Sequence, residues 1–180
     1  LFQGVKPYTY QPHAIRSRYR KRGGRLRIGL ISPDFRRHVM AFFSYALFHD
    51  YDARLYEIYA YTNCIEDGVS AELRNCATEW RNLRGLSPVQ AAQVVHEDEL
   101  DVLVDLAGHT GHNLLPVLAY RPAPVQISGI GYFATTGLPA IDDFLSDPYI
   151  DPIEPGGQGN DRYFTERLLR LPHSHCCYMW

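Results

Sequence analysis

The stretch Leu26-Arg-Ile-Gly-Leu-Ile-Ser-Pro-Asp-Phe-Arg-Arg-His38 decides the fold, because a short apolar run passes into a polar turn just before a helix-like segment. The run Leu26 to Ser32 predicts a strand, and Met40 to His49 places apolar side chains at helical spacing. The turn between them carries Asp34, two arginines and His38. In open α/β sheets, ligands bind in the crevice outside the carboxyl ends of the strands. The stretch therefore predicts a strand–loop–helix unit with its polar groups at a binding edge.

Two later segments repeat this pattern of a strand followed by a small, polar loop. They are Asp105-Leu-Ala-Gly-His-Thr-Gly111 and Gly129-Ile-Gly-Tyr-Phe-Ala-Thr-Thr-Gly137. We refer to residues 33–38, 106–112 and 130–137 as the first, second and third loops. Parallel strands point their carboxyl ends the same way, so the three loops are expected to share one cleft. Arg27 and Asp101, at the opposite strand ends, are expected far from it.

The remaining pattern alternates strands with helices. Helices are expected at 69–76, from the Ser87-Pro88 cap to about Glu97, and around 113–120, where Pro116 fits if it lies in the first turn. Further strands are expected at 56–62, 79–83, 101–106, 125–128 and 143–146, with a helical turn and a strand over 162–171. This alternation predicts an α/β fold, a Rossmann-like parallel sheet with helices on both faces.

Length and composition favour one domain of a cytoplasmic protein. Residues 1–25 are interpreted as an extended lead-in, 26–175 as the lobe, and 176–180 as the start of a connection to a second half. No apolar run is long enough for a membrane span and no signal-peptide pattern is present. The net charge of −2 does not indicate nucleic acid, although the basic run at 16–25 leaves an anionic partner open. The four cysteines lack Cys-x-x-Cys spacing and are expected as free thiols without zinc.

Each candidate side chain has two readings on spacing alone. His38 is either a helix-capping or surface histidine, or a group that transfers a proton or contacts a diphosphate. Asp34 either orients His38 or begins the helix as a favourable acid. His109 and His112 have a weak metal-site spacing, and the glycines of the second and third loops form either tight turns or close approaches to a ligand. His96 is most simply a cation at a helix carboxyl terminus.

Four collinear motifs resemble the amino-terminal half of the catalytic region of the O-GlcNAc transferase family, including its bacterial tetratricopeptide-linked members. They cover roughly residues 25–175 and are Arg27 to His38, Asp101 to Thr110, Arg121-Pro-Ala-Pro-Val-Gln126 and Gly131 to Gly137. The resemblance implies one Rossmann-like lobe of a GT-B glycosyltransferase. Its donor is a UDP-sugar, its acceptor a Ser or Thr hydroxyl of a protein or peptide, and no metal or cofactor is needed. The carboxyl-terminal lobe that holds most of the donor is expected outside this sequence, and residues 1–25 would join a tetratricopeptide region.

The resemblance also assigns site residues. It implies catalytic roles for His38, which reaches the donor diphosphate and the acceptor, and for His96. It implies a backbone wall at Ile130-Gly131 near the sugar. The substrate and donor contacts expected are Asp34, Gly108, His109, Thr110, Ile130, Gly131, Tyr132 and Thr136.

Two departures from the family pattern keep a second hypothesis open. The family's Gly-Tyr-Pro is Gly131-Tyr132-Phe133 here, and Gln93 stands where animal enzymes have an acid. The first hypothesis is the acceptor-side lobe of a protein O-glycosyltransferase, and the second is a non-catalytic binding or scaffold domain. A response-regulator-like or flavodoxin-like domain is disfavoured because no acidic pocket or aromatic flavin box accompanies the loops.

Overall fold

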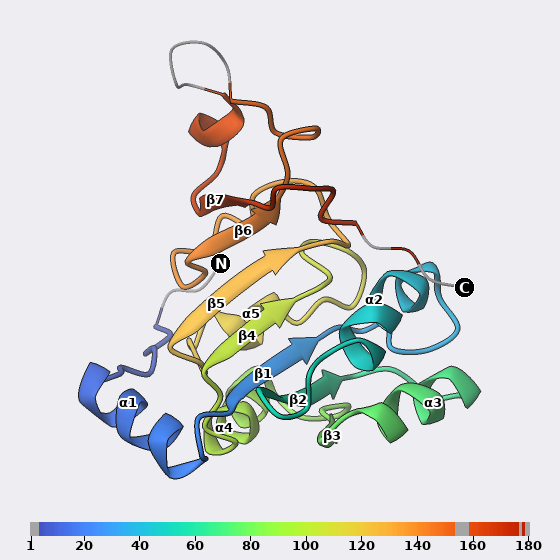
Figure 1. The fold of residues 1–180 in the computed structure, drawn as a ribbon, viewed down its shortest axis with the longest axis vertical. Helices are drawn as coiled ribbons and strands as arrows, with labels where there is room; N and C mark the ends of the chain where they lie inside the picture. The colour runs from blue at the N-terminus through green and yellow to red at the C-terminus, as the bar shows by residue number, and fades with distance from the viewer. Residues whose placement is uncertain (1–3, 154–158, 177, 179–180) are drawn as a thin grey trace.

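The computed structural model describes residues 4–153, 159–176 and 178, and its centre is a single seven-stranded parallel sheet (Figure 1). The strand order is β3-β2-β1-β4-β5-β6-β7, so the chain builds outward from β1 in one direction and then from β4 in the other. The strands are β1 (Leu26–Ile31), β2 (Tyr56–Thr62), β3 (Glu79–Asn82), β4 (Val102–Asp105), β5 (Val125–Gly129), β6 (Asp143–Ser146) and β7 (Arg167–Arg170).

Helices cover both faces of the sheet, as the sequence predicts. One buried cluster packs α2 (Val39–His49) and α3 (Gly68–Cys76) against β1 and β2, and includes Phe48, Ile58 and Leu73. The other cluster packs α4 (Pro88–Glu97) and α5 (Leu115–Leu118) against the opposite face, with Val95 and Leu103 at its centre. Parallel strands covered on both sides are accordingly almost wholly apolar. The fold class predicted from the sequence is confirmed.

Local sequence sets the ends of these helices. The Ser87 and Gln90 side chains form a capping box at the start of α4, with Pro88 at the first helical position. Asp67 and Ser70 form the same arrangement at the start of α3. Pro116 lies in the first turn of α5, the position in which proline removes no helical hydrogen bond.

The lead-in differs from the prediction. Its residues 12–21 form α1 (Pro12–Lys21) and are not extended. Pro12 suits the first helical turn, and the basic residues of the last turn suit the negative end of the helix dipole, so prolines that appeared to break structure here begin it. The lead-in also contacts the core, because the Tyr8 N–H donates to the Tyr120 carbonyl at 2.8 Å.

The far end of the described chain contains η1 (Asn160–Tyr163) before β7, which confirms the predicted helical turn and strand. Cys64, Cys76 and Cys176 are free thiols, as expected, whereas Cys177 lies outside the described residues. No helix in the described part of the chain has the length and apolarity needed to cross a bilayer.

Candidate functional site

The three loops leave the sheet side by side. Ile31, Asp105 and Ser128 are aligned across the adjacent strands β1, β4 and β5, and each loop begins within a few residues of this row. The arrowheads of these strands point to the same side of the molecule in Figure 1. Arg27 and Asp101 lie together at the other edge, where the Arg27 N–H donates to Asp101 at 2.9 Å. The loops thus follow the same edge of the sheet, as expected, and a cleft shared by all three stays a prediction.

His38 is the N-cap of α2, so the capping interpretation is correct. Its Nδ1 accepts the Met40 N–H at 3.3 Å. A neutral imidazole whose Nδ1 accepts a hydrogen bond carries its proton on Nε2, and His38 is partly exposed to solvent. The cap therefore fixes a tautomer with an Nε2–H that can donate to a ligand beside the positive end of the helix dipole.

Asp34 is buried next to His38 without a hydrogen bond to it. Its carboxylate lies 3.7 Å from His38 Nδ1 and 3.3 Å from an Arg36 nitrogen. At 3.7 Å the contact with His38 is longer than a hydrogen bond. Asp34 thus contributes charge near the imidazole, while the Met40 backbone sets the orientation of the ring.

The second loop is held by Asp105, a residue that the sequence reasoning did not select. Its fully buried carboxylate accepts the N–H groups of Ala107 and Gly108 at 3.1 and 2.9 Å, and the Ser128 hydroxyl at 2.6 Å. Burial raises the pKa of this carboxyl, and the three donors oppose that rise. Because Ser128 belongs to β5, Asp105 also ties the second loop to the strand that leads into the third.

Glycines allow the third loop to pack closely against the second loop and the start of α2. A Cβ on Gly108, whose φ is +52°, would lie 2.5 Å from the Tyr132 side chain of the third loop. A Cβ on Gly131 would lie 2.1 Å from the Leu106 carbonyl oxygen of the second loop and 3.1 Å from the Met40 sulfur. Met40 donates its N–H to His38, so Gly131 is packed between the second loop and the start of α2.

The third loop stores strain and is fixed by a buried acid. Ile130 has φ +71°, a left-handed conformation that is costly for a β-branched residue. Such a conformation persists where the surrounding contacts hold the backbone in place. Glu166, which precedes β7, accepts the Thr136 N–H at 2.8 Å, the Thr136 hydroxyl, and the Thr135 hydroxyl at 2.6 Å. His109 Nε2 lies 2.9 Å from the Thr136 carbonyl oxygen, which links the second loop to the third.

Thr110 is a predicted contact residue, whereas His112 is a candidate only through its weak metal-site spacing with His109. Thr110 has a buried hydroxyl with no hydrogen-bond partner among the described residues. His112 is exposed, and its φ of +60° turns the chain after the second loop. The described residues contain no group of three or more His, Cys, Asp or Glu side chains arranged to hold a metal.

His96 is not brought to the three loops. It lies in the last turn of α4, at the amino-terminal edge of the sheet, where its ring stacks on Tyr8 with centroids 3.7 Å apart. The Tyr10 hydroxyl lies 3.1 Å from His96 Nδ1. A catalytic role at the loop cluster is therefore incompatible with its position, and we assign His96 to anchoring the amino-terminal segment. Gln93 is also remote from the loops and donates to Glu97.

Comparison with known proteins supports the family resemblance along almost the entire chain. Residues 3–177 match the family model "Glycosyl transferase family 41". The rice protein named "Probable UDP-N-acetylglucosamine--peptide N-acetylglucosaminyltransferase SPINDLY" is 35% identical over 156 residues, covering 84% of this chain and 16% of the relative. The UDP-N-acetylglucosamine--peptide N-acetylglucosaminyltransferase of Caenorhabditis elegans is 28% identical over 158 residues, covering 84% and 13%.

A solved structure agrees with these sequence relatives. A mutant O-GlcNAc transferase from Thermobaculum terrenum superposes with a TM-score of 0.78 at 35% identity, over 84% of this chain and 28% of that one. The present chain thus spans less than a third of the solved chain and about a sixth of the rice relative. Sheet, loop cluster and family match together show that the chain belongs to glycosyl transferase family 41.

Proposed function

We propose that this chain is the acceptor-side lobe of a protein O-glycosyltransferase that moves N-acetylglucosamine from a UDP-sugar to Ser or Thr hydroxyls. The observation that carries the proposal is the close packing of the third loop against the second loop and the start of α2, which is capped by a histidine whose Nε2–H can donate to a ligand. The relatives named above are described as acting on UDP-N-acetylglucosamine and peptides. The proposed site residues are His38, Asp34, Gly108, His109, Thr110, Ile130, Gly131, Tyr132 and Thr136.

In the proposed reaction, the acceptor oxygen forms a bond to the anomeric carbon of the sugar while the bond from that carbon to the diphosphate breaks. UDP leaves with the electron pair of the broken bond, and the hydroxyl proton is released. His38 donates its Nε2–H to the departing diphosphate, and the amino terminus of α2 adds favourable electrostatics. The occupied Nδ1 makes a donor role for His38 simpler than that of a general base, which would need the other tautomer.

Gly131 and Ile130 form the wall against the sugar. Their backbone is held by the contacts to Leu106 and Met40, so the wall is in place before the substrate binds. A second lobe, which we place outside this sequence, would supply most donor contacts. A cytoplasmic location is supported by the free thiols Cys64 and Cys76, and a tetratricopeptide region before residue 25 stays a prediction.

The test is transfer of radiolabelled N-acetylglucosamine by the protein with its complete reading frame. His38→Ala is expected to lower the rate by more than about tenfold without loss of folding, because a leaving-group donor acts in the transition state. His13→Ala, on exposed α1, is the matched control and should leave the rate unchanged. Wild-type-like transfer by the His38 variant would return that residue to a purely capping role. No transfer by the wild-type protein would favour the scaffold hypothesis.

A further inference from the structure

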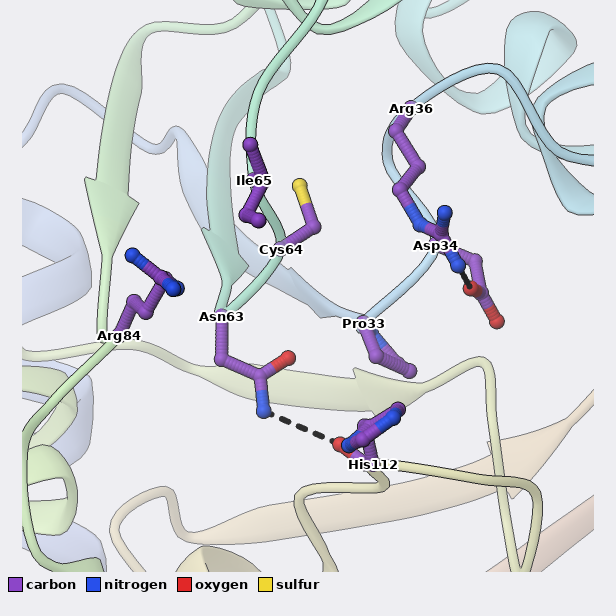
Figure 2. Close-up of a pocket in the computed structure, with 8 residues that line it drawn as sticks. All are labelled: Pro33, Asp34, Arg36, Asn63, Cys64, Ile65, Arg84 and His112. Carbon is purple, nitrogen blue, oxygen red and sulfur yellow. Dashed lines mark hydrogen bonds and ion pairs between the residues drawn. The ribbon is translucent and has the colours of Figure 1, made fainter.

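A separate cavity of about 310 Å³ opens beside the first loop (Figure 2). It lies at the carboxyl ends of β1, β2 and β3, beside His112 at the end of the second loop. Asp34 is the one member of the proposed transfer site that lines it. The side chains that give the cavity its chemistry are Arg36, Asn63, Arg84 and His112.

The charges on the cavity wall are unbalanced. Arg36 forms an ion pair with Asp34 at 3.3 Å. Arg84 is exposed, and within the described ranges no carboxylate lies within 4.0 Å of its guanidinium group. The lining thus carries two guanidinium groups and one carboxylate, which leaves a single positive charge for a ligand to neutralise. An arginine fork matches the two oxygens of a carboxylate.

Asn63 adds an unused acceptor to the same wall. Its Nδ2 donates to the His112 carbonyl at 3.0 Å, and its Oδ1 is buried with no partner among the described residues. Figure 2 shows this amide extending from the end of β2 toward His112, with Pro33 nearby. A buried acceptor without a partner is uncommon in native proteins and calls for an explanation. A ligand N–H in this cavity would complete its hydrogen bonding after a small rotation of the amide.

Apolar surface lies next to these polar groups. Ile65 is 72% exposed at the rim, and Pro33 lines the interior. Such a wall fits the methylene groups of an acidic side chain. A volume of about 310 Å³ is at the lower end for small-molecule sites, which suits one or two residues of a peptide.

We propose that this cavity binds the carboxylate of an acidic residue in the peptide acceptor, with Arg84 as its principal contact and Asn63 accepting a peptide N–H. Naming the ligand as an acceptor peptide rests on the proposed transferase function. The single uncompensated charge fits a carboxylate better than a diphosphate, whose higher charge would exceed what the wall can neutralise. An acidic residue near the acceptor hydroxyl would then be a specificity determinant.

The test is an NMR titration of this chain with two end-capped peptides that differ only in Glu or Gln beside a serine. The Glu peptide is expected to bind about fivefold more tightly, the upper range for an exposed ion pair. Arg84→Gln should remove the difference, and Arg84→Lys should restore part of it. Arg16→Gln, an exposed arginine on α1, is the matched control and should preserve the difference.

Equal affinities of the two peptides for the wild-type chain would overturn the proposal. It would also be overturned if UDP or inorganic phosphate occupied the cavity and lost binding in Arg84→Gln, because the site would then be for phosphate. The titration needs no sugar transfer. A complete protein that is inactive, combined with Arg84-dependent selection of the Glu peptide, would therefore reject the transferase function and keep the peptide site.

Discussion

Removing the Glu166 carboxylate should release the third loop. Glu166 is 4% exposed and accepts two hydrogen bonds from Thr136 and one from Thr135. In Glu166→Ala, the N–H and hydroxyl of Thr136 lose their buried acceptor, and each loss costs about 1–3 kcal/mol. The expected total is therefore about 2–6 kcal/mol. For a chain of this length, 1 kcal/mol corresponds to roughly 2–4 °C in Tm, so the midpoint should fall by about 10 °C.

Glu166→Gln separates hydrogen bonding from charge. Its amide oxygen can accept both bonds from Thr136. Its nitrogen would face the Thr135 oxygen, which already accepts the N–H groups of Gly137 and Thr165, so the variant should melt between Glu166→Ala and the wild type. Glu97→Ala, an exposed acid at the end of α4, is the control for losing a surface carboxylate and should change stability by less than about 0.5 kcal/mol.

The assays are thermal unfolding followed by circular dichroism and hydrogen exchange of the Thr136 amide. The exchange measurement reports the loop itself, since that amide donates directly to Glu166. If Glu166→Ala melted within 1–2 °C of the wild type, or if its Thr136 amide stayed protected, Glu166 would not be what holds the loop.

Two further perturbations test the packing around Gly131 and the hydrogen bonds to Asp147. Gly131→Ala places a Cβ 2.1 Å from the Leu106 carbonyl oxygen and should lower the free energy of unfolding by about 1–3 kcal/mol, as measured in thermal melts. Gly111→Ala is the control and should be neutral, because a Cβ there has nothing within 4 Å. Equal Tm values for the two variants would refute the close packing at Gly131. Hydrogen bonds hold the pKa of Asp147 well below its usual range, and the largest effect comes from the His175 backbone N–H. The stability that these bonds contribute is therefore present above the ordinary Asp pKa and is lost as the pH falls through the lowered value. Asp147→Asn should make unfolding less sensitive to acid below about pH 4, and an unchanged slope in acid melts would contradict that assignment.

Features encoded over a few residues were predictable from the sequence. The capping box at Ser87 fixes the start of α4, and the apolar run from 101 predicts β4 because both of its faces are covered. Glu166 was not predictable from the sequence, because its hydrogen bonds join segments that are far apart along the chain. It lies 30 residues from Thr136, and no local spacing connects an acid before the edge strand β7 to a threonine after the interior strand β5.

The position of His96 shows how topology constrains a motif match. A helix that joins two parallel strands starts at their carboxyl edge and ends at their amino edge. A histidine in the last turn of α4 therefore lies at the edge away from the loops, next to Tyr8 and Tyr10. The order of strands and helices in the sequence is therefore enough to place His96 at the amino edge, whereas a match to a family position takes no account of that order.

Phe133 is the departure that most favoured a scaffold, because it replaces a rigid proline. The structure fixes the third loop by other means. Gly131 is packed against the second loop and α2, and Thr136 is held by both Glu166 and His109. The Phe133 side chain is 59% exposed. Since the backbone on both sides of Phe133 is anchored, the loss of a proline does not free the wall that we propose faces the sugar, and this substitution alone is no argument against catalysis.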